Sequence, residues 1–106
     1  MKSSIPLVSA ALLALAGCAT STAVPPGLAA GKFVQFACAG GKTFSARAAA
    51  DGGSVRVRAH HGSAELDRKA DGLYEGEGYS LRVAGADAVS LMHGGKPEAQ
   101  QCKPAA

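Results

Sequence analysis

The chain has 106 residues, with 11 Lys and Arg against 8 Asp and Glu, three Phe, two Tyr and no Trp. This length holds one domain, and a small net charge with interspersed signs argues against nucleic acid as a partner. The scarcity of aromatic side chains argues against a sugar-stacking platform.

The N-terminus has the pattern of a bacterial lipoprotein signal peptide. Lys2 supplies the charge, residues 5–16 form an apolar stretch, and Leu15-Ala16-Gly17-Cys18 matches the lipobox that signal peptidases cut before a cysteine. The apolar stretch is too short to span a bilayer, which takes about 20 residues. We therefore predict a lipoprotein signal peptide over residues 1–17 and lipidation of Cys18 as a membrane anchor. The alternative is an ordinary secretory peptide with an incidental cysteine.

The residues after Cys18 predict where the protein is held. Ala19 stands where an aspartate acts as an inner-membrane retention signal in many enteric bacteria, so we expect the outer membrane, facing the periplasm. Residues 19–31 carry no charge and no aromatic side chain, and Pro25-Pro26 stiffens their middle. Residues 18–31 are therefore expected to be the lipidated cysteine and a flexible tether, followed by a domain over residues 32–106.

Cys38 and Cys102 are the two cysteines that remain once Cys18 carries lipid. A domain this small buries little surface and needs a stabilising cross-link. The envelope outside the inner membrane is oxidising, which allows a disulfide to form. We expect one disulfide between them, tying the first strand to the last segment. A metal site or a redox dithiol would call for a C-x-x-C spacing, which the sequence lacks.

From residue 32 onward, apolar residues recur with a period of two between glycine-containing turns, as in short antiparallel strands. Residues 54–59 give the clearest strand, with Arg56 and Arg58 facing water. Turns are expected at residues 40–41, 51–53, 75–78, 85–87 and 94–95. The expected inward residues are Val34, Phe36, Cys38, Phe44, Ala46, Ala48, Val55, Val57, Ala59, Ala64, Leu66, Tyr79, Leu81, Val83, Val89 and Leu91. Seven or eight short strands predict an all-β domain that closes into a small barrel or a tight sandwich.

An enzyme and a metal-binding protein are the alternatives that the sequence raises. Glu75 and Glu77 flank Gly76 in an expected exposed turn, so we interpret them as solvated charges. The motifs of serine hydrolases, P-loop proteins and zinc peptidases are missing from the sequence. We therefore expect no enzymatic activity and no cofactor.

Copper handling would use His60-His61 and Met92-His93, which could offer imidazole and thioether ligands across one end of a barrel. Adjacent residues on a strand point to opposite faces, so at most one of His60 and His61 could join His93. We expect these to be surface histidines at strand ends and assign no metal site.

The lipobox and several short motifs of the domain resemble one known family. The motifs are Val34-Gln35-Phe36-Ala37-Cys38, residues 41–44, Ala70-Asp71-Gly72-Leu73-Tyr74, residues 85–91 and a terminal cysteine. Over residues 33–102, the chain is similar to the membrane-bound lysozyme inhibitors of C-type lysozyme. The resemblance implies a small antiparallel β-barrel of about eight short strands, here closed by one disulfide, which pushes loop residues into the active-site cleft of lysozyme.

The resemblance also implies a binding surface. In that family, a serine in a Ser-Gly-x-x-Tyr motif and a lysine before a later glycine address the two catalytic carboxylates, which a hydroxyl and a cation suit in a partly desolvated cleft. Here Asp71 stands at the serine, the spacing from Gly72 to Tyr74 is one residue shorter, and Ala84 precedes Gly85 in place of the lysine. An aspartate would repel the carboxylates.

Nearby cations can compensate for these departures. Lys69 lies two residues before Asp71 and Arg82 two before Ala84, so in extended segments each would share the face of that position. The expected lysozyme-binding residues are Lys69, Asp71, Gly72, Tyr74, Arg82 and Gly85. The alternative is that the charges are solvated strand faces, with Tyr74 filling the barrel and Gly72 forming a turn.

The sequence thus predicts an envelope lipoprotein that binds and inhibits a C-type lysozyme, with the membrane as its second partner through the N-terminal lipid. The alternative function is a non-inhibitory envelope binding or structural lipoprotein of the same fold.

Overall fold

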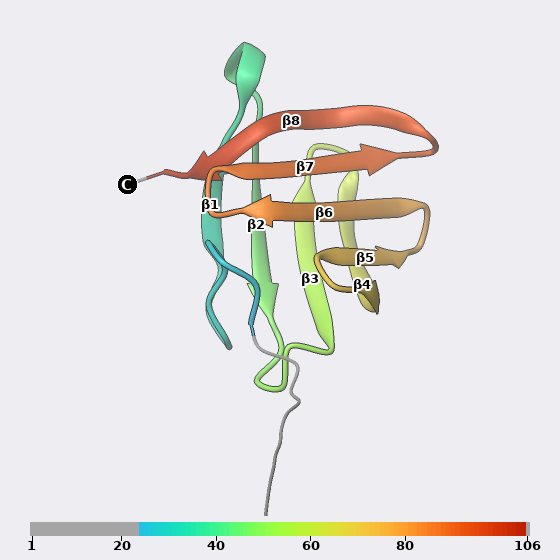
Figure 1. Ribbon diagram of the computed structural model, residues 1–106. Helices are drawn as coiled ribbons and strands as arrows, with labels where there is room; N and C mark the ends of the chain where they lie inside the picture. Colours follow the sequence, from blue (N-terminus) through green and yellow to red (C-terminus); the bar gives the residue numbers. More distant parts are fainter. Residues whose placement is uncertain (1–23, 106) are drawn as a thin grey trace, which may run out of the picture.

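The computed structural model describes residues 24–105, which form a closed antiparallel barrel (Figure 1). Each strand pairs with the next along the chain, and β8 returns to pair with β1. The strands are β1 (Val34–Ala37), β2 (Thr43–Ala48), β3 (Ser54–Ala59), β4 (Gly62–Ala70), β5 (Leu73–Gly76), β6 (Tyr79–Gly85), β7 (Ala88–His93) and β8 (Lys96–Pro104). The all-β, eight-stranded barrel expected from the sequence is confirmed. The predicted signal peptide over residues 1–17 and Cys18 lie outside the described residues.

The core is the inner face of the strands, where every second side chain is buried. Val55 and Val57 of β3 are fully buried, whereas Arg58 of the same strand is exposed. Phe36 and Phe44 face each other across β1 and β2 and stack with ring centroids 5.0 Å apart. The alternation therefore converts the period of two in the sequence into one apolar interior.

Small side chains let this short barrel close. Ala46, Ala48, Ala64 and Ala99 are all buried among the larger residues of the core. Since interiors pack at high density, small residues leave room for the rings and branched side chains of facing strands. Among the described residues, no polar or charged residue belongs to the buried class.

The predicted disulfide joins Cys38 and Cys102, which are 64 residues apart in the sequence. β1 ends at Ala37, so Cys38 is not the last inward residue of that strand as we expected; it precedes η1 (Ala39–Gly41), a short 3-10 turn that leads into β2. Cys102 lies in β8 and is fully buried. The bridge thus fastens the strands that close the barrel.

Residues 24–31, the described part of the expected tether, pack against the barrel. Val24 and Leu28 lie against the core cluster, and Ala29 and Gly31 exchange backbone hydrogen bonds with Ala48 at 3.1 and 2.8 Å. The reason is that the apolar side chains of Val24 and Leu28 gain burial there. Only residues 18–23 of the expected tether remain outside the described part of the chain.

Successive turns alternate between the two ends of an up-and-down barrel. One end, here called the proximal end, has the turns at residues 50–53, 71–72 and 86–87, and the N-terminal segment lies against it. The other, the histidine end, has the turns at residues 60–61, 77–78 and 94–95. The turn expected over residues 75–78 is shorter than predicted, because β5 continues to Gly76. Within residues 24–105 there is no helix with the length and apolar character to span a bilayer.

Candidate functional site

The two turns that the resemblance singles out lie side by side at the proximal end. The Val83 backbone N–H, near the end of β6, donates a hydrogen bond of 2.7 Å to the carbonyl oxygen of Gly72 in the β4–β5 turn. Gly72 has φ +72°, and a β-carbon there would lie 2.5 Å from the carbonyl oxygen of Val83. Only glycine fits this approach, and it brings the turn carrying Asp71 next to the strand that leads to Gly85.

Asp71 is ion-paired with Arg68 and is otherwise in water. Its side chain is 96% exposed, whereas that of Arg68 is 34% exposed. The register shifts between Arg68 and Ala70, and residues 71–72 form a turn, so Lys69 and Asp71 do not share one face of an extended strand. That expectation is wrong because a bulge interrupts β4. Arg68 instead supplies the positive charge beside Asp71.

Tyr74 belongs to the core of the barrel. It is 1% exposed, and its hydroxyl donates a hydrogen bond of 2.8 Å to the carbonyl oxygen of Gly52. Burial raises the pKa of the Tyr74 hydroxyl above 10.0. The side chain therefore fills the interior and holds the 50–53 turn against β5. Its role at the proximal end is to support the Asp71–Gly72 turn from inside the barrel.

Arg82 faces outward from the middle of β6, opposite Leu73 and Ser90. It lines an open groove with Ser80 and Met92, whereas Asp71 lines a separate cavity of about 330 Å³. The walls of that cavity are Val24, Pro25, Pro26, Arg68, Asp71, Gly72, Tyr74 and Val83. The structure thus groups Asp71, Gly72 and Tyr74 and leaves Lys69 and Arg82 as exposed cations on the flanking strands.

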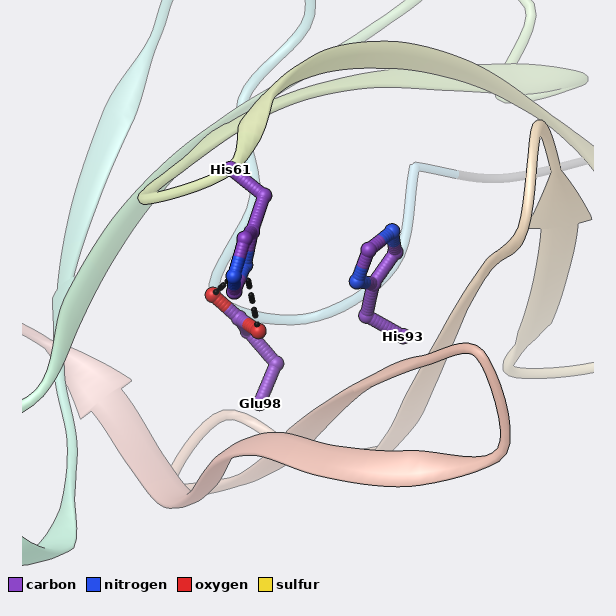
Figure 2. Close-up of side chains that lie close together, drawn as sticks. All are labelled: His61, His93 and Glu98. Atoms are coloured by element: carbon purple, nitrogen blue, oxygen red, sulfur yellow. Dashed lines mark hydrogen bonds and ion pairs between the residues drawn. The ribbon is translucent and has the colours of Figure 1, made fainter.

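A second cluster of polar side chains lies at the histidine end. Figure 2 shows His61, His93 and Glu98 converging on one another, with the Nδ1 of His61 within hydrogen-bonding distance of both carboxylate oxygens of Glu98, at 3.1 and 3.2 Å. The His61 and His93 rings stack at 5.0 Å between centroids. One potential ligand atom from each of the three residues lies within 4.8 Å of the others.

Three different elements supply this cluster. His61 comes from the β3–β4 turn, His93 is the last residue of β7, and Glu98 is in β8. The register shifts where Met92 pairs with Pro97 and Leu91 with Ala99, so Glu98 is the extra residue of a bulge. A bulge re-aims a side chain, and here it turns Glu98 toward the histidines.

Two members of this cluster, His61 and His93, were among the possible ligands that the sequence raised. Only one of the adjacent histidines, His61, reaches His93; His60 contacts His61 edge-on, with ring centroids 5.2 Å apart. Met92 lines the outer groove with Arg82 and is not part of the cluster. Glu98 was not among the candidate ligands, since periodicity alone does not reveal a bulge.

Tyr79 forms the floor of the histidine end. Its ring stacks on His93 with centroids 4.3 Å apart, and its buried hydroxyl oxygen has no hydrogen-bond partner among residues 24–105. Burial raises the pKa of the Tyr79 hydroxyl, and the charge of Glu98 raises it further. The hydroxyl is thus a buried donor to which the described part of the chain offers no acceptor.

Comparisons with models of protein families, with curated proteins and with solved structures found no match. The sequence motifs and the geometry of the two ends of the barrel are therefore what indicates a function.

Proposed function

We propose that the protein is a bacterial envelope lipoprotein that binds and inhibits a C-type lysozyme through the proximal end of its barrel. The observation that carries the proposal is the contact between Gly72 and Val83, because it joins the β4–β5 turn to the end of β6, the two segments that the family resemblance implicates. The confirmed barrel and disulfide are what the resemblance implies for the fold.

The charges at this end fit the proposal better than the sequence suggested. An isolated Asp71 would repel the two acids of a lysozyme cleft, but Arg68 pairs with it and offsets its charge. Lys69 and Arg82 are exposed on either side of the turn. Cations that enter a partly desolvated cleft form charge-assisted hydrogen bonds with carboxylates, which are stronger than neutral ones.

The Gly72 turn is built to be presented rigidly. The backbone hydrogen bond from Val83 fixes the position of the turn relative to β6, and the buried ring of Tyr74 packs beneath the turn. A preorganised loop loses little conformational entropy when it enters a cleft, so more of the interaction energy remains as affinity.

The test is a titration of the oxidised full-length chain, in mild detergent, against a C-type lysozyme degrading bacterial cell walls. We expect saturable inhibition that is lost when the Cys38–Cys102 disulfide is reduced. Closing a loop of 64 residues restricts the unfolded chain by about 4 kcal/mol, which is a large share of the stability of a small domain.

Two variants map the surface. Asp71→Ser should strengthen inhibition by about tenfold, since it removes a carboxylate and restores a hydroxyl, and Arg82→Ala should weaken it by a similar factor. Lys42→Ala is the matched control, because Lys42 is an exposed cation beside η1, away from the proposed surface. A folded protein that fails to inhibit, with or without Asp71→Ser, would favour the non-inhibitory envelope lipoprotein of the same fold.

A further inference from the structure

We propose that His61, His93 and Glu98 form a binding site for a divalent first-row transition-metal ion, with Zn²⁺ as the best match. The site lies at the histidine end and is independent of lysozyme binding. Two imidazoles and one carboxylate are the donor set of many zinc sites that have three protein ligands and one open position. In this chain the donors come from three separate elements and converge within 4.8 Å.

The charge of the cluster calls for a cation. The Glu98 side chain is only 14% exposed, and within residues 24–105 its one ion-pair partner is His61. The Glu98 carboxylate is thus mostly withdrawn from water, and a negative charge there is costly without a compensating positive charge. A bound divalent ion would supply that charge at the point on which the three side chains converge (Figure 2).

The distances suit a zinc ion. Zinc–ligand bonds of about 2.0–2.1 Å in a tetrahedron place neighbouring ligand atoms about 3.3 Å apart. The separation of 3.1 Å between the Nδ1 of His61 and the Glu98 carboxylate already matches this spacing. The nitrogen of His93 has to move by about 1.5 Å at most, which a rotation of its half-buried ring provides.

The identity of the donors selects the ion. A soft thioether would favour copper in its reduced state, but Met92 lies on the outer face of β7 with the groove of Arg82. The remaining nitrogen and oxygen donors suit Zn²⁺ and other borderline divalent ions. His61 and Glu98 also line an open groove of about 670 Å³ together with Lys42, Ser45 and Arg58, so water or a small anion has access to the fourth position.

A bound ion would act as a second cross-link. It would tie the β3–β4 turn to the β7–β8 hairpin, which are held together at this end by side chains rather than by strand pairing. The disulfide fastens β8 near the other end of that strand, at Cys102. Metal binding should therefore raise the thermal midpoint, because the ion binds only the folded arrangement of its ligands.

The experiment titrates Zn²⁺ into the metal-free, oxidised full-length chain in mild detergent and follows the heat of binding. We expect one ion per chain. His93→Ala and Glu98→Gln should each weaken binding by at least about tenfold. His60→Ala is the matched control: it removes a neighbouring exposed histidine outside the cluster and should leave the affinity unchanged.

Two further measurements keep the result interpretable. The metal-free thermal midpoint of each variant shows whether it is folded, and nuclear magnetic resonance of the histidine rings reports which of them respond to Zn²⁺. Shifts at His61 and His93 but not at His60 would support the site. Zn²⁺ binding that survives His93→Ala in a folded protein, that depends on His60, or that does not occur in the parent chain would overturn it.

Discussion

The two buried tyrosines differ in one bond. The Tyr74 hydroxyl donates to the carbonyl oxygen of Gly52, whereas the Tyr79 hydroxyl is buried with no partner within residues 24–105. A net hydrogen bond contributes about 1 kcal/mol, but removing one partner leaves the other buried and unpaired. Tyr74→Phe should therefore lower the free energy of unfolding by about 1–2 kcal/mol in urea denaturation. Tyr79→Phe should be neutral or stabilising, and equal losses in the two variants would contradict this assignment.

The same two hydroxyls predict a loss of stability in alkali. Burial raises the pKa of both above 10.0 in the folded protein. Between the unfolded and the folded pKa, the folded chain retains protons that the unfolded chain releases, so the free energy of unfolding falls as the pH rises. The contribution is complete below about pH 10 and is lost above it. Urea denaturation between pH 8 and 11 measures this slope, which should be smaller in the double variant with phenylalanine at both positions.

At the scale of the elements, Gly72 determines how the β4–β5 turn meets β6. A β-carbon there would meet the Val83 carbonyl oxygen at 2.5 Å, and φ is +72°. Gly94 has a similar φ of +61°, but no atom of the described residues lies within 4 Å of the added carbon. Gly94→Ala should cost about 1 kcal/mol from backbone conformation alone, whereas Gly72→Ala should cost about 3 kcal/mol or more. Thermal or urea unfolding of both variants gives the comparison, and equal costs would mean that the Val83 contact yields easily.

The elements also show how far the sequence could predict the structure. Alternation assigned the inner faces of β3, β6 and β7 correctly, because the buried residues of each strand are separated by single residues that are more exposed. Bulges were not predictable. The bulge near Arg68 separated Lys69 from Asp71, and the one at Glu98 created the histidine cluster. A shift of register is a property of how two strands pair, so the alternation within either strand does not reveal it.

The docking of residues 24–31 was missed for a related reason. Their composition is that of a linker, and nothing local distinguishes Val24 and Leu28 from other small apolar residues. Their burial depends on the surface at the proximal end, which exists only after the barrel has closed. The whole molecule thus determines the state of this segment.

At the scale of the whole molecule, the proposed lipid anchor limits the access of lysozyme to the proposed binding surface. Cys18 lies six residues before Val24, so a docked segment holds the proximal end within about 20 Å of the membrane. A globular enzyme of even 100 residues is more than about 30 Å across, given a radius of gyration of about 13 Å. Lysozyme can therefore reach the Asp71 turn of the anchored protein only if residues 24–31 detach from the barrel.

Detachment exposes the partly buried side chains of Val24 and Leu28 and breaks the two backbone hydrogen bonds to Ala48. A cost of about 1–2 kcal/mol corresponds to about a tenfold loss of affinity. We therefore expect the lipidated protein on vesicles to inhibit lysozyme about tenfold more weakly than an unlipidated Cys18→Ser chain. Inserting ten Gly and Ser residues between positions 23 and 24 should restore inhibition on vesicles, because the enzyme then fits without detachment. The same insertion after Pro104 should have no effect, and equal inhibition by the anchored and free proteins would place the binding surface elsewhere on the barrel.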